Sequence, residues 1–201
     1  VWAADSKGIY FASLAEGLQG MFEAVCDGGE WEIERLTGED MWYDFGSPFH
    51  VTEGEDGSRT LYTTWCSMDF PTEIVAVTVP ASDTYMQSVA GVPVAPQAYY
   101  KQITDENGHI LGQLTPHKTE ARMVKTVDGK DMLTWVLYPP QFDESKVYPS
   151  ILICLGGPQG TLSQGWSYRW NYRLMADQGY VVVLPNRRGT TAFGQEWTEQ
   201  I

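Results

Sequence analysis

The chain has 201 residues, a formal net charge of −13 and a sequence pI near 4.5. Hydrophobic residues make up 43% of it and aromatic residues 13%, which is enough apolar material for a folded core and excludes wholesale disorder. The acidic balance excludes a nucleic-acid-binding protein, because such a protein needs a basic face against the phosphates. No segment approaches the ~20 consecutive apolar residues of a membrane helix, so we expect no membrane span.

The charge is unevenly distributed along the chain. Residues 1–115 hold 18 acidic and 4 basic residues, whereas residues 116–201 hold 8 acidic and 9 basic residues. Such a shift favours two domains with different surfaces. The alternative is an ordinary acidic face that keeps the protein soluble. The chain begins at Val1 with no basic segment, so we interpret it as the interior of a longer gene product.

The cysteines and histidines give no sign of a metal site or a cofactor. Cys26, Cys66 and Cys154 are widely spaced, and the three histidines are scattered along the chain. All three cysteines lie in apolar, strand-like segments, so we predict buried free thiols. A disulfide between Cys26 and Cys66 stays open, so cysteine usage does not decide the redox compartment.

Short strands are predicted throughout the first half of the chain. Segments rich in aromatic and β-branched residues are separated by turn residues, which is typical of a β-sheet domain. One segment, 31–37, alternates apolar and polar residues and predicts a strand with a single solvent-facing side. The predicted strands are 8–13, 20–25, 31–37, 47–51, 60–65 and 73–79.

The strands of the first half show an internal repeat. Tyr10 corresponds to Tyr62 at a spacing of 52 residues, and the strand that carries Glu23 corresponds to the one that carries Glu73. Four-stranded units at such spacings are typical of β-propeller blades, which close into rings of about 4–8. Residues 1–119 are therefore predicted to be a partial β-propeller. A β-sandwich is the alternative.

The pattern changes near residue 120. A hairpin is predicted with strands 122–127 and 132–138 around the turn at Asp128-Gly129-Lys130. The apolar run 149–155 predicts a strand buried on both faces, and 180–185 predicts a second one after a helix over 168–178. Strand, helix and strand form a parallel crossover unit. The segment 191–201 is predicted to be a turn that enters another helix.

Five short segments of the second half stand out together: YP at 148–149, LGGPQG at 155–160, GYVVV at 179–183, NRRGT at 186–190 and FGQ at 193–195. With these segments the second half resembles the prolyl oligopeptidase family of serine peptidases, and within it the bacterial dipeptidyl-peptidase and acylaminoacyl-peptidase types. The approach over 126–130 and 138–140 matches the family's entry into its hydrolase domain. The resemblance is specific over 120–201 and weaker over 1–119.

This resemblance implies a mixed fold: C-terminal blades of a β-propeller over 1–119, then the first strands and helix of an α/β-hydrolase catalytic domain over 120–201. The implied activity is hydrolysis of short peptides through a Ser-Asp-His triad. The last histidine is His117, and Ser167 in Gly165-Trp166-Ser167-Tyr168-Arg169 is followed by Arg where the motif has Gly. We therefore interpret Ser167 as a helix N-cap and expect the triad to lie beyond residue 201, which leaves this chain inactive by itself.

The family's glycine turn implies a partial oxyanion hole in this chain. The backbone N–H of Gly157 is the candidate donor, and Gly156 and Pro158 belong to the same turn. The two glycines also fit a tight turn that needs positive φ. Leu155 stands where some members have a hydroxyl donor, and it cannot donate. For Arg187 and Arg188, which follow a buried strand, we predict that one pairs with a carboxylate inside the domain.

Several alternatives stay open. The chain could serve as a non-catalytic propeller-based binding scaffold, or it could belong to an esterase-type hydrolase. Acidic residues of the first half are candidates to bind a peptide's α-amino group, but the sequence does not select among the 18. Unpaired strand edges favour edge-strand pairing or a homo-oligomer. The resemblance implies a periplasmic or secreted location, while the residues also allow a cytoplasmic one.

Overall fold

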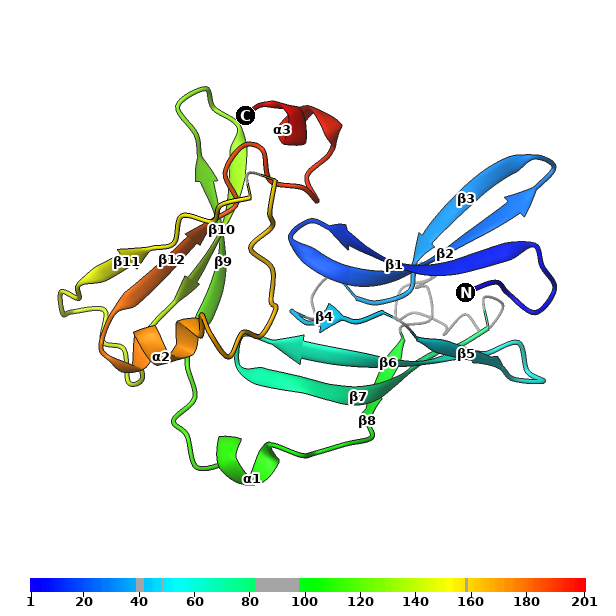
Figure 1. The fold of residues 1–201 in the computed structure, drawn as a ribbon, viewed down its shortest axis with the longest axis horizontal. Coiled ribbons are helices and arrows are strands. Elements are labelled where there is room, and N and C mark those ends of the chain that lie inside the picture. The colour runs from blue at the N-terminus through cyan, green and yellow to red at the C-terminus, as the bar shows by residue number, and fades with distance from the viewer. Residues whose placement is uncertain (39–41, 48, 82–97, 158) are drawn as a thin grey trace, which may run out of the picture. The chain divides into compact units, whose positions relative to one another are not determined.

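The computed structural model describes residues 1–38, 42–47, 49–81, 98–157 and 159–201. The chain divides into two compact units (Figure 1). The first comprises Val1–Ser13, Gln19–Trp65 and Thr72–Glu106, and the second comprises Leu14–Leu18, Cys66–Pro71 and Asn107–Ile201. The second unit therefore includes two short hairpin turns from the earlier part of the chain.

The first unit contains two sheets. One has the order β1-β2-β3, and the other has the order β4-β6-β7-β8, with β5 also pairing with β6. The strand pairs β2–β3, β5–β6 and β7–β8 are antiparallel. All six predicted strands are present, the one predicted over 47–51 being shifted along the chain. The strands are β1 (Gly8–Ala15), β2 (Leu18–Asp27), β3 (Glu30–Arg35), β4 (Asp44–Phe45), β5 (His50–Glu53), β6 (Arg59–Ser67), β7 (Phe70–Val79) and β8 (Tyr99–Gln102).

The strands that the predicted repeat pairs, β1 with β6 and β2 with β7, are all present, but the residues that mark the repeat agree in burial for one pair only. Glu23 and Glu73 are both buried, as equivalent positions should be. Tyr10 is 2% exposed, but Tyr62 is 42% exposed. Because side chains alternate between the two faces of a strand, a spacing of 52 residues joins an inward position of β1 to an outward position of β6. The two sheets do not close a propeller ring within the described residues.

Strand β3 corrects a second expectation. Its alternation predicted one buried face, but Trp31 and Ile33 are both exposed. The strand lies at the edge of a three-stranded sheet, and its apolar side chains meet no covering layer among the described residues of the first unit. An alternating pattern therefore reported the strand correctly and its burial incorrectly.

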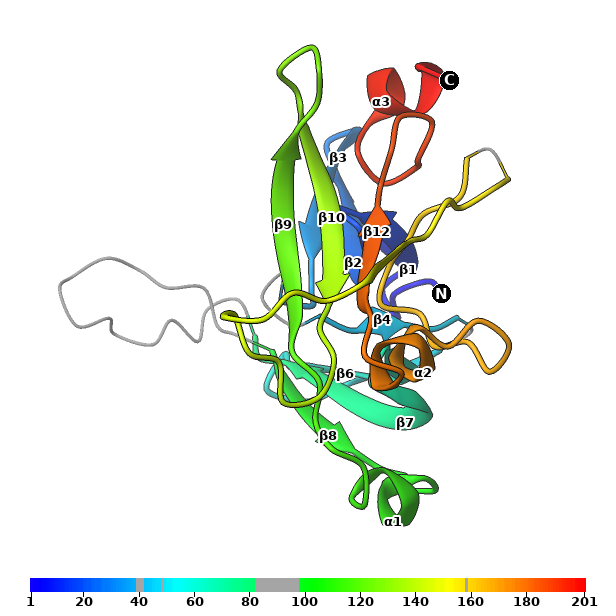
Figure 2. The same cartoon turned by 90° about the vertical axis from the view of Figure 1, so that its left-hand side faces the viewer.

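The second unit is built on one mixed sheet with the order β11-β12-β10-β9 (Figure 2). The predicted hairpin is confirmed, with Val124 of β9 opposite Met132 of β10. Strands β11 and β12 are parallel, with Ile151 opposite Val182, and helix α2 lies between them in the chain, so the predicted crossover unit is confirmed. The elements are α1 (Gly108–Leu111), β9 (Thr119–Lys125), β10 (Asp131–Leu137), β11 (Ser150–Leu152), α2 (Tyr172–Asp177), β12 (Val181–Pro185) and α3 (Gln195–Glu199).

The core of the second unit surrounds the central strand β10, where every side chain over 133–137 is buried. Strand β11 was predicted to be buried on both faces, but Leu152 is 61% exposed. Side chains project from the two faces of a sheet, and at this edge strand the described residues leave the face that carries Leu152 largely uncovered. The core residues are Leu18, Met68, Leu133, Trp135, Leu137, Leu162, Ala176, Val182 and Leu184.

The three cysteines are free. Because both are free, the open possibility of a disulfide between Cys26 and Cys66 is not realised; both are half-buried, whereas the prediction had them buried. Cys154 is exposed, which corrects the prediction that it is buried. It follows the edge strand β11, where the apolar sequence context does not bring a covering layer.

Candidate functional site

The glycine turn follows β11, at the carboxyl end of a strand that is parallel to its neighbour. In parallel sheets the loops at this end of the strands are the usual location of ligand-binding and catalytic groups. Gly157 has φ = +133° and Gly156 does not have a positive φ, so the predicted need for glycine is confirmed only at Gly157. Both glycines are exposed. Pro158, the third residue assigned to this turn, lies outside the described residues.

The side chain of Asn186 holds the C-terminal end, at Leu162, of the loop that follows β11. Its side chain is 1% exposed, and it accepts a hydrogen bond from the Leu162 N–H (2.9 Å) and donates one to the Leu162 carbonyl (2.9 Å). The indole Nε1 of Trp135 donates to the same carbonyl at 3.0 Å. A buried amide that is satisfied in this way rigidifies its surroundings, so Leu162 is held against the end of β12.

The side chain of Arg187 holds the N-terminal end of the same loop, at Leu155. Its Nη2 donates to the carbonyl of Leu155 at 3.0 Å, and its Nη1 donates to the carbonyl of Arg188 at 2.7 Å. Leu155 directly precedes the two glycines. Two adjacent residues after β12 therefore hold both ends of the segment 155–162. The sequence showed this pair only as part of the NRRG segment, and spacing gave no sign of the long-range contacts.

Arg188 forms the predicted ion pair within the domain. Its guanidinium group pairs with the Asp128 carboxylate and lies over the ring of Trp197, 4.8 Å from the ring centre. The hydrogen bond from the Thr126 hydroxyl and the pairing with Arg188 lower the pKa of Asp128. The prediction that one of the two arginines pairs with a carboxylate is thus confirmed for Arg188.

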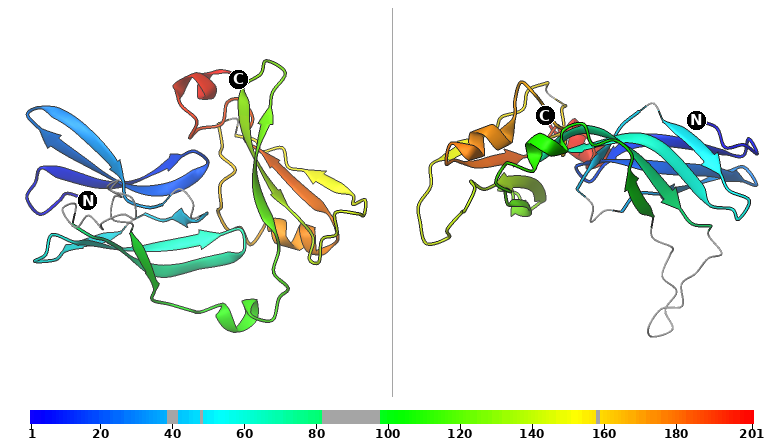
Figure 3. Two further views of the ribbon diagram at one scale, coloured as in Figure 1. Left: turned by 180° about the vertical axis from the view of Figure 1, so that it is seen from behind. Right: turned by 90° about the horizontal axis from the view of Figure 1, so that it is seen from below.

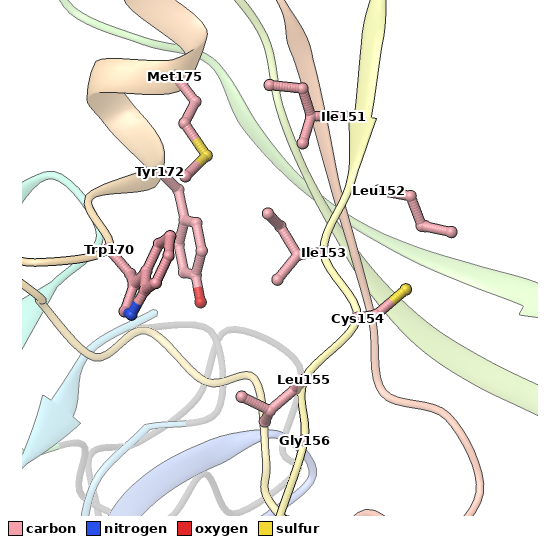
Figure 4. Close-up of a pocket in the computed structure, with 9 residues that line it drawn as sticks. All are labelled: Ile151, Leu152, Ile153, Cys154, Leu155, Gly156, Trp170, Tyr172 and Met175. Atoms are coloured by element: carbon pink, nitrogen blue, oxygen red, sulfur yellow. The ribbon is translucent and has the colours of Figure 1, made fainter.

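An apolar pocket of about 480 Å³ lies beside the strand that leads into the turn (Figure 4). Ile151 and Ile153 point into it, while Leu152 and Cys154 point away, as alternation along a strand requires. The opposite wall comes from α2 and the residues before it. Burial raises the pKa of the Tyr172 hydroxyl. The lining residues are Ile151, Leu152, Ile153, Cys154, Leu155, Gly156, Trp170, Tyr172 and Met175. The pocket can hold an apolar group next to the glycine turn.

Ser167 is not the N-cap of the helix. Its Oγ accepts a hydrogen bond from the Trp170 N–H at 3.0 Å and closes a turn outside the helix. Asn171 is the N-cap of α2, and its Oδ1 accepts from the Leu174 N–H at 3.2 Å. Because this cap lies four residues later, the helix predicted over 168–178 is shorter and begins at Tyr172. Figure 3 shows it as a short orange coil.

A buried charged cluster lies on the other side of α2 in the second unit. The side chain of His117 is fully buried, with Nε2 3.0 Å from Oδ1 of Asp177. Arg173 donates to the carbonyls of Asp69 (2.8 Å) and Thr115 (3.1 Å). Burial lowers the pKa of His117 against the opposing effect of Asp177, and burial raises the pKa of Asp69 against the opposing effect of Arg173. The cluster joins α2 to the hairpin turn 66–71.

Three acidic residues among the described residues of the first unit are buried: Glu23, Asp44 and Glu73. Glu23 forms an ion pair with Arg59 across the two sheets, and it contributes, after burial, to raising the pKa of Tyr10. Glu73 accepts a hydrogen bond from Oγ1 of Thr104 at 2.5 Å. Because Glu23 already has a cationic partner, it is a poor candidate for binding a peptide's α-amino group.

Within the described ranges there is no group of three or more His, Cys, Asp or Glu side chains able to hold a metal ion. In the same part of the chain no helix has the length and apolarity needed to cross a membrane.

Comparison with known proteins supports the resemblance that the sequence predicted. Residues 166–201 match the model of the prolyl oligopeptidase family. The whole chain is 42% identical to a dipeptidyl-peptidase 5 of Porphyromonas gingivalis over 201 residues, which is 25% of that protein. A stretch of 99 residues, 49% of the chain, is 59% identical to a dipeptidyl-peptidase 5 of Porphyromonas endodontalis and covers 14% of it.

Among solved structures, the chain is similar to an acylaminoacyl peptidase of Pyrococcus horikoshii. The TM-score is 0.65 at 21% sequence identity, over 94% of this chain and 25% of that one. A structure described as an acylaminoacyl peptidase in complex with Z-Gly-Gly-Phe-chloromethyl ketone matches with a TM-score of 0.66 at 20% identity, over 95% of this chain and 25% of that one. At these identities the likeness concerns the fold, which is mostly β with few helices. The chain spans about a quarter of the length of the Porphyromonas gingivalis relative and of both solved structures.

Proposed function

We propose that the chain is part of a longer serine peptidase of the prolyl oligopeptidase family, of the dipeptidyl-peptidase type, which hydrolyses short peptides. The observation that carries the proposal is the glycine turn at the carboxyl end of β11, with Gly157 exposed at φ = +133°. The likeness to two dipeptidyl-peptidases 5 supports the choice of peptides as substrates.

We propose that residues 1–119 are blades of a β-propeller and that residues 120–201 open an α/β-hydrolase domain. The two sheets of the first unit support the first part, since hairpin-connected strands with a partial repeat are what blades contain. An antiparallel hairpin followed by a parallel crossover supports the second part. In this proposal the open edge of β11 pairs with a further strand of the longer protein.

In the proposed mechanism, Gly157 supplies one donor of the oxyanion hole. Attack on the peptide carbonyl places negative charge on its oxygen, and a fixed N–H group aimed at that oxygen lowers the barrier by about 3 kcal/mol. Gly156 belongs to the same turn, and Leu155 contributes no side-chain donor of its own. The pocket of about 480 Å³ beside the turn gives the site an apolar wall.

We propose that the nucleophilic serine, the aspartate and the histidine all lie beyond residue 201. The Ser167 hydroxyl is engaged with the Trp170 N–H, and the last histidine of the sequence is the buried His117. The second oxyanion donor is the N–H that follows the nucleophile in this fold. The resemblance also supports a periplasmic or secreted location for the longer protein.

The test is covalent labelling of the longer protein with a fluorophosphonate probe, followed by identification of the modified residue. The proposal expects one labelled serine beyond residue 201, none in residues 1–201, and release of dipeptides from the N-terminus of short peptides. Absence of serine labelling would favour a non-catalytic propeller-based scaffold. Faster turnover of a simple acyl ester than of a dipeptidyl amide would favour an esterase.

A further inference from the structure

We propose that Arg187 is a positioning residue, whose guanidinium group holds the Leu155 carbonyl and thereby sets the direction of the Gly157 N–H. The inference rests on the proposed function, because it concerns the same oxyanion turn. It adds a residue that no sequence motif assigned to the site, and it gives a physical reason for the length and planarity of that side chain.

The glycine turn restrains its own backbone conformation only weakly. Gly156 and Gly157 carry no Cβ, so their dihedral angles are restrained little by local sterics, and a glycine peptide is ordered only at an entropic cost. A Cβ placed on Gly156 would meet nothing within 4 Å, so its surroundings do not restrain it either. Contacts from outside the turn must therefore hold its conformation.

The hydrogen bond from Arg187 lies one peptide before the Gly157 N–H. Its Nη2 reaches the Leu155 carbonyl at 3.0 Å, and the peptide that carries this carbonyl directly precedes the one that carries the Gly157 N–H. Rotation of the Leu155–Gly156 peptide would change the direction of the next N–H. A donor fixed on the Leu155 oxygen opposes that rotation.

Arg187 is itself held in place by its surroundings. Arg187 follows β12 directly after Asn186, which is buried and bonded to both backbone polar groups of Leu162. The Nη1 of Arg187 is bound in turn to the Arg188 carbonyl at 2.7 Å. A planar guanidinium group can reach two carbonyls on separate segments at once, which a lysine ammonium on a flexible stem does less well.

The neighbouring arginine has a different task. Arg188 pairs with Asp128 and packs on Trp197, so it joins elements of the second unit. Arg187 is half-buried and directs two of its donors at main-chain carbonyls. The pair thus divides into one residue that stabilises the fold and one that orients the turn.

The test compares R187A and R187K with the unchanged longer enzyme, and uses R169A as the matched control. Arg169 is exposed and contacts the ring of Trp170, so its loss removes an arginine without touching the turn. We expect kcat for a dipeptidyl p-nitroanilide to fall about 10-fold in R187A with KM nearly unchanged, because a displaced donor weakens only the transition state. R187K should recover part of kcat, and so should millimolar guanidinium ion added to R187A.

A second readout does not depend on activity. Hydrogen exchange followed by mass spectrometry should show faster exchange in the peptide that covers residues 155–161 of R187A, with β12 unchanged. If kcat of R187A equals that of R169A, or if KM alone rises, the inference is wrong. If R187A does not fold, R187K decides, since exchange and kcat equal to those of the unchanged enzyme would overturn the inference. If the unchanged enzyme releases no dipeptide, the proposed function fails, while the exchange data still decide whether Arg187 orients the turn.

Discussion

Replacing Asn186 with alanine tests how strongly the buried amide holds the loop. The substitution removes two hydrogen bonds of 2.9 Å to Leu162, each worth about 1 kcal/mol net. It also leaves the Leu162 N–H without its acceptor in a buried place, which adds about 1–3 kcal/mol. The Leu162 carbonyl keeps its bond from Trp135. We therefore expect the free energy of unfolding to fall by about 3–5 kcal/mol.

The assay is urea unfolding followed by tryptophan fluorescence, with N171A as the matched control. Asn171 caps α2 with a single exposed hydrogen bond, so its loss should lower stability by about 1 kcal/mol. A loss in N186A that is no larger than the loss in N171A would refute the reasoning, because it would mean that the buried bonds to Leu162 contribute no more than a surface cap.

The variant N186D tests the same buried site through the pH dependence of its stability. A carboxylate at this position still accepts from the Leu162 N–H, but it cannot donate to the Leu162 carbonyl while it is ionised. Burial should raise its pKa above the unfolded value, so the folded state binds the proton more tightly. The stability of N186D relative to the unchanged protein should therefore improve as the pH falls from 7 to 5. If the difference in stability between N186D and the unchanged protein stays constant from pH 7 to pH 5, position 186 is not buried.

Three further predictions concern other positions. Because burial lowers the pKa of His117 despite Asp177, the folded state binds fewer protons there; thermal stability should fall as the pH drops below about 6.5, and H117Q should show a shallower fall between pH 7 and pH 5. G157A should lower stability by about 1–3 kcal/mol because of its φ of +133°, and unfolding in urea should show a smaller loss for G156A. Cys154 should react with an alkylating reagent faster than the two half-buried cysteines, as peptide mass spectrometry can show; equal rates would contradict its exposure.

Much of the local structure follows from the sequence alone. Alternating and β-branched segments predict the strands, and Asp128-Gly129-Lys130 predicts the hairpin turn, because these signals act over a few residues. The glycine at position 157 is likewise predictable, since the strand before it and the turn it makes are both local. The family resemblance also follows from short segments of sequence.

Burial and long-range contacts were decided only by the tertiary structure. Leu152 and Ile33 carry the same apolar signal as core residues, yet both lie on edge strands, and a strand pattern does not say whether a neighbour covers it. Arg187 and Asn186 reach residues 32 and 24 positions earlier in the chain, and no local period connects them. The glycines of the turn can be recognised in the sequence. The side chains that hold the turn, Asn186 and Arg187, follow the neighbouring parallel strand β12.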